Sequence, residues 1–428
     1  MTKKENFFTK SRILRLIIIA ISGSVIFEVP YLRYLYYDPL LEAVGLSNAQ
    51  FGTTMSVFGI VSMLTYFPGG IIADKFSAKK LITFSLLGVA LTGIWFSFFP
   101  GYATQLIIYS LWAIFISLVF WAAMNKAIRV TGDSSEQGRL FGLIEGGRGL
   151  FPMLYGFVVL AIFNALGANT FGLVWVIRSY SILSAIGAIL VWIFLEDVDD
   201  VKEVSENKAS TEKGNAIRNM IAVLKQPSVW MIAIIIFSSF VVYAGQSYIT
   251  PYLSEMFGAS VSLVAALGLI RTYGLAIGGG PLSGVFADKV KSSTKVLIAC
   301  FAIIAVMLAV FLLVPANPSL IVVVVVAMII MGFFVFATRG IYFATVDEAC
   351  IPMELTGSAV GFASFIGFIP DAFIYTLFGS WMDKHPGAEG YELIFKFMII
   401  FAILGFLASL ALIRMIKKNK ERRNVKNG

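Results

Sequence analysis

The sequence predicts an all-α polytopic membrane protein, with twelve transmembrane helices arranged in two pseudo-symmetric six-helix halves. Three observations predict this fold: the composition, a series of long apolar runs, and a short motif that occurs twice. Of the 428 residues 58% are hydrophobic and only 14% are charged, whereas a soluble protein of this length carries roughly a quarter charged residues. The chain therefore belongs in a bilayer.

A transmembrane helix needs about 20 mostly apolar residues, and it satisfies its own backbone groups in lipid. Twelve runs of this kind are present: 13–41, 50–73, 80–99, 103–128, 139–163, 170–195, 228–254, 261–287, 295–314, 318–345, 357–382 and 391–416. The first run is expected to be a spanning helix, because no small-residue cleavage site of a signal peptide follows it.

Only one connection between the runs is long. Residues 196–226 are polar and highly charged, and they separate the sixth run from the seventh. We therefore expect an N-terminal six-helix half at 1–195, a cytoplasmic linker at 196–226, and a C-terminal six-helix half at 227–428.

The basic residues predict the orientation. Of 33 Lys and Arg residues, 26 fall in the termini, the linker and the loops of one side, and only Lys384 falls in a loop of the other. Cytoplasmic loops carry the excess of basic residues. We expect a multi-pass protein of the cytoplasmic (inner) membrane with both termini in the cytoplasm. The net charge of +8 is then a topology signal, and nucleic acid is not an expected partner.

The motif G-x-x-A-D-K ends both the second and the eighth runs, and its two aspartates, 74 and 288, are 214 residues apart. The residues that recur are Gly70, Asp74 and Lys75 in the first copy, and Gly284, Asp288 and Lys289 in the second. This motif resembles the signature loop of the major facilitator superfamily, in which a glycine usually stands where this chain has Ser77. The resemblance implies transport by alternating access, with a substrate site between the halves, and conformational gating by Gly70, Asp74, Lys75, Asp288 and Lys289.

Within that superfamily, the first half is similar to the organophosphate:phosphate antiporters. Arg33 follows Leu14-Arg15 at the spacing of their phosphate-binding arginine, and Arg148 takes the place of their substrate-binding histidine on helix five. Their second arginine position, on helix seven, is Tyr243 here. Arg271 on helix eight is similar instead to the arginine of oxalate:formate and nitrate carriers. The resemblance implies an anion carrier.

Charged side chains within the apolar runs favour the same conclusion. The five arginines are Arg33, Arg148, Arg178, Arg271 and Arg339, and the three carboxylates are Glu28, Glu145 and Asp371. Such residues are rare in spanning segments and usually face a cavity. A buried guanidinium without a counter-charge is unfavourable, and its planar fork binds oxyanions at two points. An anionic substrate would therefore stabilise this excess of arginine.

We expect Arg33, about midway along an extended first helix, and Arg271 to clamp the substrate from opposite halves, with Arg148 between them. Further candidates for lining the substrate site are Tyr34, Tyr243, Gln246, Trp121 and Asn125.

Several of the charges have an alternative role. Glu145 and Arg148 have the i, i+3 spacing of an ion pair on one helix, Arg178 can extend outward to the membrane surface, and Arg339 can pair with Asp371.

Glu28 and Arg33 are about 140° apart if both lie on one α-helix, which disfavours direct pairing. Glu28, Glu145 and Asp371 are candidates for proton coupling, and pairing with an arginine from a neighbouring helix is the alternative.

The predicted function is secondary transport of a small organic anion (a phosphate ester, sulfonate or carboxylate) by anion antiport or proton coupling. Two alternatives are a proton-coupled sugar or multidrug transporter, whose site would be rich in acidic residues, and a transporter-like membrane sensor. We expect a monomer in the lipid bilayer, with no catalytic residue, metal or cofactor. The chain has one histidine, two cysteines and no nucleotide-binding loop.

Overall fold

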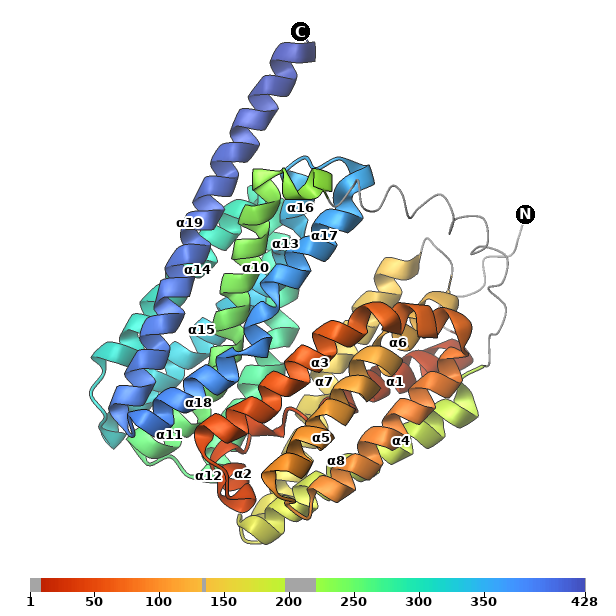
Figure 1. The fold of residues 1–428 in the computed structure, drawn as a ribbon, viewed down its shortest axis with the longest axis vertical. Coiled ribbons are helices and arrows are strands. Elements are labelled where there is room, and N and C mark those ends of the chain that lie inside the picture. Colours follow the sequence, from red (N-terminus) through yellow and green to blue (C-terminus); the bar gives the residue numbers. More distant parts are fainter. Residues whose placement is uncertain (1–8, 133–135, 197–220, 428) are drawn as a thin grey trace. The chain divides into compact units, whose positions relative to one another are not determined.

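The computed structural model describes residues 9–132, 136–196 and 221–427, and within these ranges every regular element is helical (Figure 1). The chain forms two compact units. The first comprises residues 1–46, 57–202 and 261–269, and the second comprises 47–56, 203–260 and 270–428. The all-α prediction is confirmed, whereas most of the expected linker, residues 197–220, lies outside the described residues.

The first unit contains most of the N-terminal helices and one short helix from later in the chain. Its elements are α1 (Lys10–Val25), the 3-10 turn η1 (Leu32–Tyr34), α2 (Tyr37–Val44), α3 (Asn48–Lys75) from residue 57 onward, α4 (Ala78–Phe96), α5 (Tyr102–Ala113), the π-helix η2 (Ile114–Phe120), α6 (Trp121–Val130), α7 (Gln137–Ala165), α8 (Thr170–Phe194) and α12 (Val261–Leu269).

The second unit contains the start of α3 and the remaining helices. These are α10 (Pro227–Gly245), the 3-10 turn η4 (Gln246–Tyr248), α11 (Ile249–Phe257), the π-helix η5 (Ile270–Gly274), α13 (Leu275–Val290), α14 (Ser293–Leu313), the 3-10 turn η6 (Pro318–Leu320), α15 (Ile321–Ile341), α16 (Ala344–Glu348), α17 (Met353–Gly367), the 3-10 turn η7 (Ile369–Ala372), α18 (Ile374–Lys384) and α19 (Ala388–Asn427).

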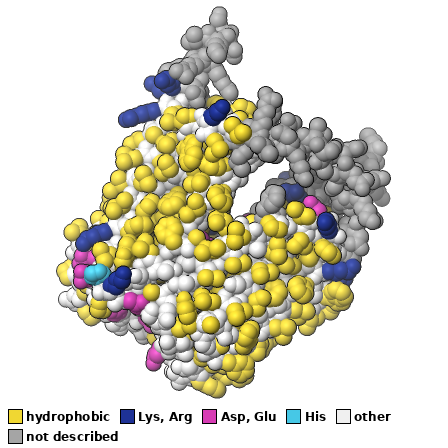
Figure 2. Space-filling model, in the orientation of Figure 1, with side chains coloured by type: hydrophobic (Ala, Val, Ile, Leu, Met, Phe, Trp, Pro, Cys, Tyr) yellow, Lys and Arg dark blue, Asp and Glu magenta, His cyan; other side chains and the backbone are white. Residues whose placement is uncertain are grey.

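Ten of the helical segments in the described ranges are long and apolar enough to cross a membrane, and α3 is an eleventh, bent by 56° between Tyr66 and Pro68. Large apolar side chains on their outer surfaces are exposed, among them Leu91 (71%) and Leu313 (80%). Figure 2 shows hydrophobic side chains over much of the visible surface of the helices. Such surfaces suit a lipid environment rather than water.

The predicted single helix over the first run is wrong. α1 ends at Val25, and the chain continues through turns to η1 and α2. Pro30 explains the break, because it has no N–H to donate and its ring clashes with the carbonyl of the residue four positions earlier. Arg33 therefore lies in a 3-10 turn and not midway along a helix. The angle of about 140° between Glu28 and Arg33 applies only if both lie on one α-helix. This segment does not form one, so the angle does not hold here.

Polar side chains cap the N-termini of several helices. Ser77, which stands where the superfamily motif usually has glycine, caps α4 by accepting a hydrogen bond from the Lys80 amide at 3.5 Å. Asn169 caps α8 in the same way, from the Phe171 amide at 3.0 Å. Side-chain caps satisfy amides that no helical carbonyl can reach, so they define where these spanning helices begin.

Close packing explains why residues 47–56 belong to the second unit. The Asp383 carboxylate on α18 accepts hydrogen bonds from the backbone amides of Asn48 (2.9 Å) and Ala49 (2.8 Å). A Cβ at Gly52 would overlap the backbone of Tyr375, so only glycine permits this approach. The start of α3 is thus fixed to α18 by a charged cap and by backbone contact.

Candidate functional site

In the first unit, Arg148 on α7 lies among polar and aromatic partners from three helices. Its Nε donates to the Gly23 carbonyl at 2.9 Å, and its Nη1 donates to Glu145 Oε1 at 2.6 Å. The guanidinium carbon lies 5.1 Å from the ring centroid of Trp121 and 5.5 Å from that of Phe27. The guanidinium therefore combines an ion pair with two cation–π contacts.

A glycine allows Arg148 to reach the backbone of α1. A Cβ at Gly23 would lie 2.7 Å from Met124 Sδ and 3.2 Å from Arg148 Cδ. The ion pair to Glu145 is the i, i+3 pair that the spacing permits. The Arg148 side chain is 17% exposed and the Glu145 side chain 62% exposed, so the carboxylate lies on the open side of the guanidinium.

Trp121 and Asn125, the two α6 candidates, lie one turn apart. Asn125 Nδ2 donates to the Trp121 carbonyl at 3.0 Å, and the Trp121 ring meets that of Phe27 edge to face at 6.4 Å. The structure therefore brings Trp121 together with Arg148, whereas Asn125 hydrogen bonds within its own helix.

Arg33 is fully buried, and its guanidinium carbon lies 5.3 Å from the centre of the Tyr37 ring. Tyr34 is 4% exposed and meets Tyr31 edge to face at 5.3 Å. Tyr34 and Tyr37 therefore belong to the packed interior of the first unit.

Glu28 is 2% exposed and lies within electrostatic reach of Tyr155 on α7 and Tyr180 on α8. The two tyrosine rings are 5.9 Å apart. Glu28 and these tyrosines form a buried cluster of titratable groups in the first unit.

Arg178 lies on α8 near aromatic residues and a hydroxyl. Its Nε donates to Ser97 Oγ at 3.2 Å, and the rings of Phe98 and Trp175 lie 5.4 and 5.6 Å from its guanidinium carbon. These contacts fit a structural role near a helix end.

In the second unit, Arg271 lies in the π-helix η5 and is 3% exposed. Its Nη1 donates to the Gln246 carbonyl at 2.5 Å and to Thr250 Oγ1 at 3.2 Å. A Cβ at Gly332 would lie 3.2 Å from Gln246 Oε1 and 3.6 Å from Arg271 Cγ. Arg271 therefore lies against a glycine of a neighbouring helix, as Arg148 does in the first unit.

Gln246 has an unused acceptor beside Arg271. The residue is 4% exposed, and Oε1 has no hydrogen-bond partner among the described residues. A buried acceptor without a donor is unfavourable, so a hydroxyl or amide placed here would be stabilised.

Arg339 lies over the ring of Tyr243, at 3.9 Å from its centre. Asp371 lies within electrostatic reach of Arg339 and of the Tyr375 hydroxyl. The pairing of Arg339 with Asp371 that the sequence permits is thus consistent with their placement. Tyr243, expected to line the site, is covered by this guanidinium.

The first signature loop is held by a residue that sequence reasoning missed. Lys126 Nζ on α6 donates to the carbonyls of Ala73 (2.8 Å) and Phe76 (3.3 Å). Asp74 and Lys75 are exposed. Cations near a helix C-terminus are favourable, so Lys126 fixes the end of α3.

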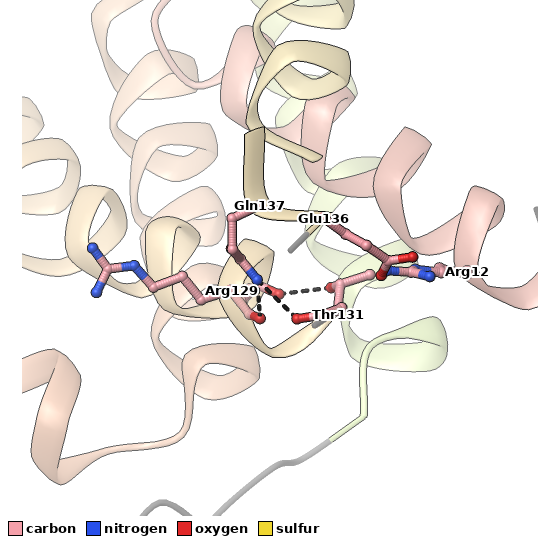
Figure 3. Close-up of polar contacts among 7 residues, drawn as sticks. Arg12, Arg129, Thr131, Glu136 and Gln137 are labelled. Carbon is pink, nitrogen blue, oxygen red and sulfur yellow. Dashed lines mark hydrogen bonds and ion pairs between the residues drawn. The ribbon is translucent and has the colours of Figure 1, made fainter. Parts of the chain in front are cut away.

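Polar contacts between the end of α6 and the start of α7 are drawn in Figure 3. Gln137 Nε2 donates to the carbonyls of Arg129 (3.0 Å) and Gly132 (2.8 Å), and Arg12 on α1 forms an ion pair with Glu136. These contacts link α1, α6 and α7.

The second signature loop has a comparable anchor. Asp288 and Lys289 are exposed, and Glu348 on α16 accepts hydrogen bonds from Ser292 Oγ (2.5 Å) and the Thr294 amide (2.9 Å). A Cβ at Gly70 or Gly284 would meet no described atom within 4 Å. The gating role of both loops stays a prediction.

Within the described ranges, no group of three or more His, Cys, Asp or Glu side chains could hold a metal ion. The long apolar helices, repeated in two units and carrying buried arginines, define a polytopic membrane transporter. The chain matches the family model of the Major Facilitator Superfamily over residues 16–374, and it belongs to that superfamily.

Three relatives align with this chain over most of their own length. The chain is 35% identical to Inner membrane protein YqcE of Escherichia coli (strain K12) over 385 residues, 89% of this chain and 90% of that protein. It is 31% identical to Inner membrane protein YihN of the same strain over 405 residues, 94% and 96%. It is 24% identical to the Hexuronate transporter of Bacillus subtilis (strain 168) over 389 residues, 87% of each.

Two solved structures share the fold. A bacterial homologue of the human lysosomal transporter Spinster has a TM-score of 0.75 and 16% identity, covering 95% of this chain and 99% of that one. A single-residue mutant of the nucleoside transporter NupG has a TM-score of 0.73 and 16% identity, covering 95% and 100%. The predicted twelve-helix fold in two halves is confirmed, and the protein is a secondary transporter of the inner membrane. The narrower likeness to organophosphate:phosphate antiporters stays a prediction.

Proposed function

We propose that the protein transports a small organic anion by alternating access. The observation that carries this proposal is the placement of Arg33, Arg148 and Arg271 in apolar segments, where their side chains are largely or fully buried. A guanidinium stays charged even in an apolar segment. An anion compensates that charge, and it binds a planar guanidinium at two points.

A relative of known cargo supports an anion. One relative is the Hexuronate transporter of Bacillus subtilis, and a hexuronate is a sugar that carries a carboxylate. Gln246 supports a cargo with hydroxyl groups, because its buried Oε1 is an acceptor that a hydroxyl could satisfy. Tyr34, Tyr243, Trp121 and Asn125 remain proposed lining residues.

We also propose a membrane orientation for the protein and a transport cycle. The distribution of Lys and Arg supports cytoplasmic termini. Asp74, Lys75, Asp288 and Lys289 are proposed to act in gating. Coupling is by anion exchange or by protons, with Glu28, Glu145 and Asp371 as the candidate proton carriers or charge partners, and a monomer is the proposed transporting species.

A thermal-shift screen tests the proposal with detergent-purified protein at constant ionic strength. The panel contains phosphate esters, inorganic phosphate, sulfonates, mono- and dicarboxylates, neutral sugars and cationic dyes. A ligand of the folded state raises the melting temperature. We expect one anion class to raise it, and Arg33→Ala or Arg271→Ala to remove the shift. A shift by sugars or dyes alone, or an anion shift that survives both substitutions, would contradict the proposal.

A further inference from the structure

We propose that Glu145 is a built-in carboxylate ligand of Arg148, and that the carboxylate of a small organic acid replaces it when the carrier binds its cargo. This inference rests on the proposed function and narrows its cargo class. The ligand is a carboxylate, such as that of a sugar acid, rather than a phosphate ester.

Three neighbours of the Arg148 guanidinium hold it in place. Its Nε is occupied by the Gly23 carbonyl at 2.9 Å, and the rings of Phe27 and Trp121 lie 5.5 and 5.1 Å from its carbon. Glu145 Oε1 binds Nη1 at 2.6 Å. The Gly23 carbonyl and the two rings thus fix the guanidinium in place. The Glu145 carboxylate already binds the Nη1 group.

Arg148 and Glu145 differ in how far their side chains are exposed. The Arg148 side chain is 17% exposed, whereas that of Glu145 is 62% exposed. An i, i+3 ion pair on one helix contributes only about 0.2–0.5 kcal/mol. Glu145 can therefore leave at little cost, while Arg148 stays fixed by Gly23, Phe27 and Trp121.

There is also space beside Glu145. Gly142 lies three residues before Glu145 on α7, so the two positions adjoin on one face of the helix. A Cβ at Gly142 would meet nothing within 4 Å in the part of the chain that the structure describes. An organic acid bound in place of Glu145 therefore has room over Gly142 for the rest of its skeleton.

The exchange also has a consequence for the transport cycle. Arg148 is neutralised by Glu145 in the empty carrier and by cargo in the loaded one, so its compensation is similar in both states. The empty carrier can then reorient, which permits net uptake without a counter-anion. Without Glu145, the empty carrier has an uncompensated Arg148 in an apolar segment, and reorientation becomes unfavourable.

The test uses purified full-length protein, D-glucuronate as the probe, isothermal titration calorimetry, and proteoliposomes that report net uptake and exchange separately. We expect Glu145→Gln to bind D-glucuronate about twofold more tightly, because the weak competing ion pair is gone, which equals about 0.4 kcal/mol. We expect this variant to keep exchange and to lose most of its net uptake. Glu145→Ala should behave in the same way, which guards against an artefact of one substitution.

The matched control is Glu392→Gln, which removes another exposed intrahelical pair, Glu392–Lys396 at 2.8 Å on α19. It should change neither affinity nor transport mode. Unchanged or weaker binding by both Glu145 variants, or net uptake equal to that of the wild type, would overturn the inference. So would undiminished D-glucuronate binding by Arg148→Gln.

The same experiment separates this inference from the proposed function. If the wild type binds a phosphate ester or sulfonate but no carboxylate, the Glu145 exchange is wrong and the anion carrier stands. If no anion binds the wild type, the proposed function is wrong and the inference fails with it.

Discussion

Arg148 and Arg271 lie in different units, and each lies against a glycine of a neighbouring helix, but their charges are compensated differently. Arg148 binds a carboxylate that is 62% exposed. Arg271 is 3% exposed and donates to two neutral oxygens, the Gln246 carbonyl and Thr250 Oγ1. An exposed carboxylate can be exchanged for another anion, whereas internal neutral acceptors are part of the fold. We therefore assign anion exchange to Arg148, and to Arg271 a larger contribution to the stability of the fold.

The largest expected effect is the loss of stability on replacing Arg271. Arg271→Ala removes the donor of two buried hydrogen bonds, to the Gln246 carbonyl and to Thr250 Oγ1, and opens a cavity, which should cost about 3 kcal/mol in unfolding free energy. Arg148→Ala should cost about 1 kcal/mol, because its carboxylate partner is exposed. Chemical unfolding in detergent micelles measures both. Equal losses for the two variants would remove the distinction between the sites.

The glycines beside the two arginines should give the next largest effects. Gly332→Ala places a Cβ 2.7 Å from Leu275 Cδ1 and should lower stability by about 1–2 kcal/mol. Gly23→Ala crowds Met124 and Arg148 and should also weaken anion binding, because it displaces the guanidinium.

For stability, Gly142→Ala is the control for both glycine variants, since its Cβ meets nothing described within 4 Å. It should leave stability unchanged or raise it by about 0.5–1 kcal/mol, as alanine favours a helix. Thermal unfolding of the three variants measures this. If Gly142→Ala lowers the melting temperature as much as the other two, the close contacts at Gly23 and Gly332 do not explain their losses.

Replacing the Trp121 ring beside Arg148 should have a smaller effect. Trp121→Leu removes a ring 5.1 Å from the guanidinium carbon, and cation–π contacts of this kind contribute about 0.5–2 kcal/mol. We expect anion affinity to fall by a few-fold in calorimetric titrations. Trp230→Leu is a suitable control, because Trp230 packs against Phe362 on α17 in the other unit. An unchanged affinity for Trp121→Leu would show that the ring does not fix Arg148.

The smallest expected effect on stability is that of Glu145→Gln. Helical i, i+3 pairs contribute about 0.2–0.5 kcal/mol, so the melting temperature in the absence of ligand should barely change. A large loss would show that Glu145 is a structural partner and not an exchangeable one.

The apolar runs were sufficient to predict the helical membrane fold, since length and hydropathy are local properties. The first run was the exception, because Pro30 ends a helix that hydropathy alone extends. The Glu145–Arg148 pair was predictable for the same local reason, as i, i+3 positions adjoin on any helix.

The other partners of the two arginines were not predictable from spacing. Gly23 is 125 residues from Arg148, and Gly332 is 61 residues from Arg271. Such contacts depend on how helices pack, which no periodicity encodes. Lys126 was missed as well, because its role as a cap of α3 depends on the packing of α6 beside the signature loop.

Uptake of D-glucuronate and of D-glucose into proteoliposomes tests the central claim most directly. The two sugars share a ring and differ in the carboxylate. We predict saturable uptake of D-glucuronate, no uptake of D-glucose, and loss of D-glucuronate uptake in Arg148→Gln. Uptake of D-glucose, uptake of neither sugar, or wild-type rates of D-glucuronate uptake by Arg148→Gln would contradict transport of an organic acid through this arginine.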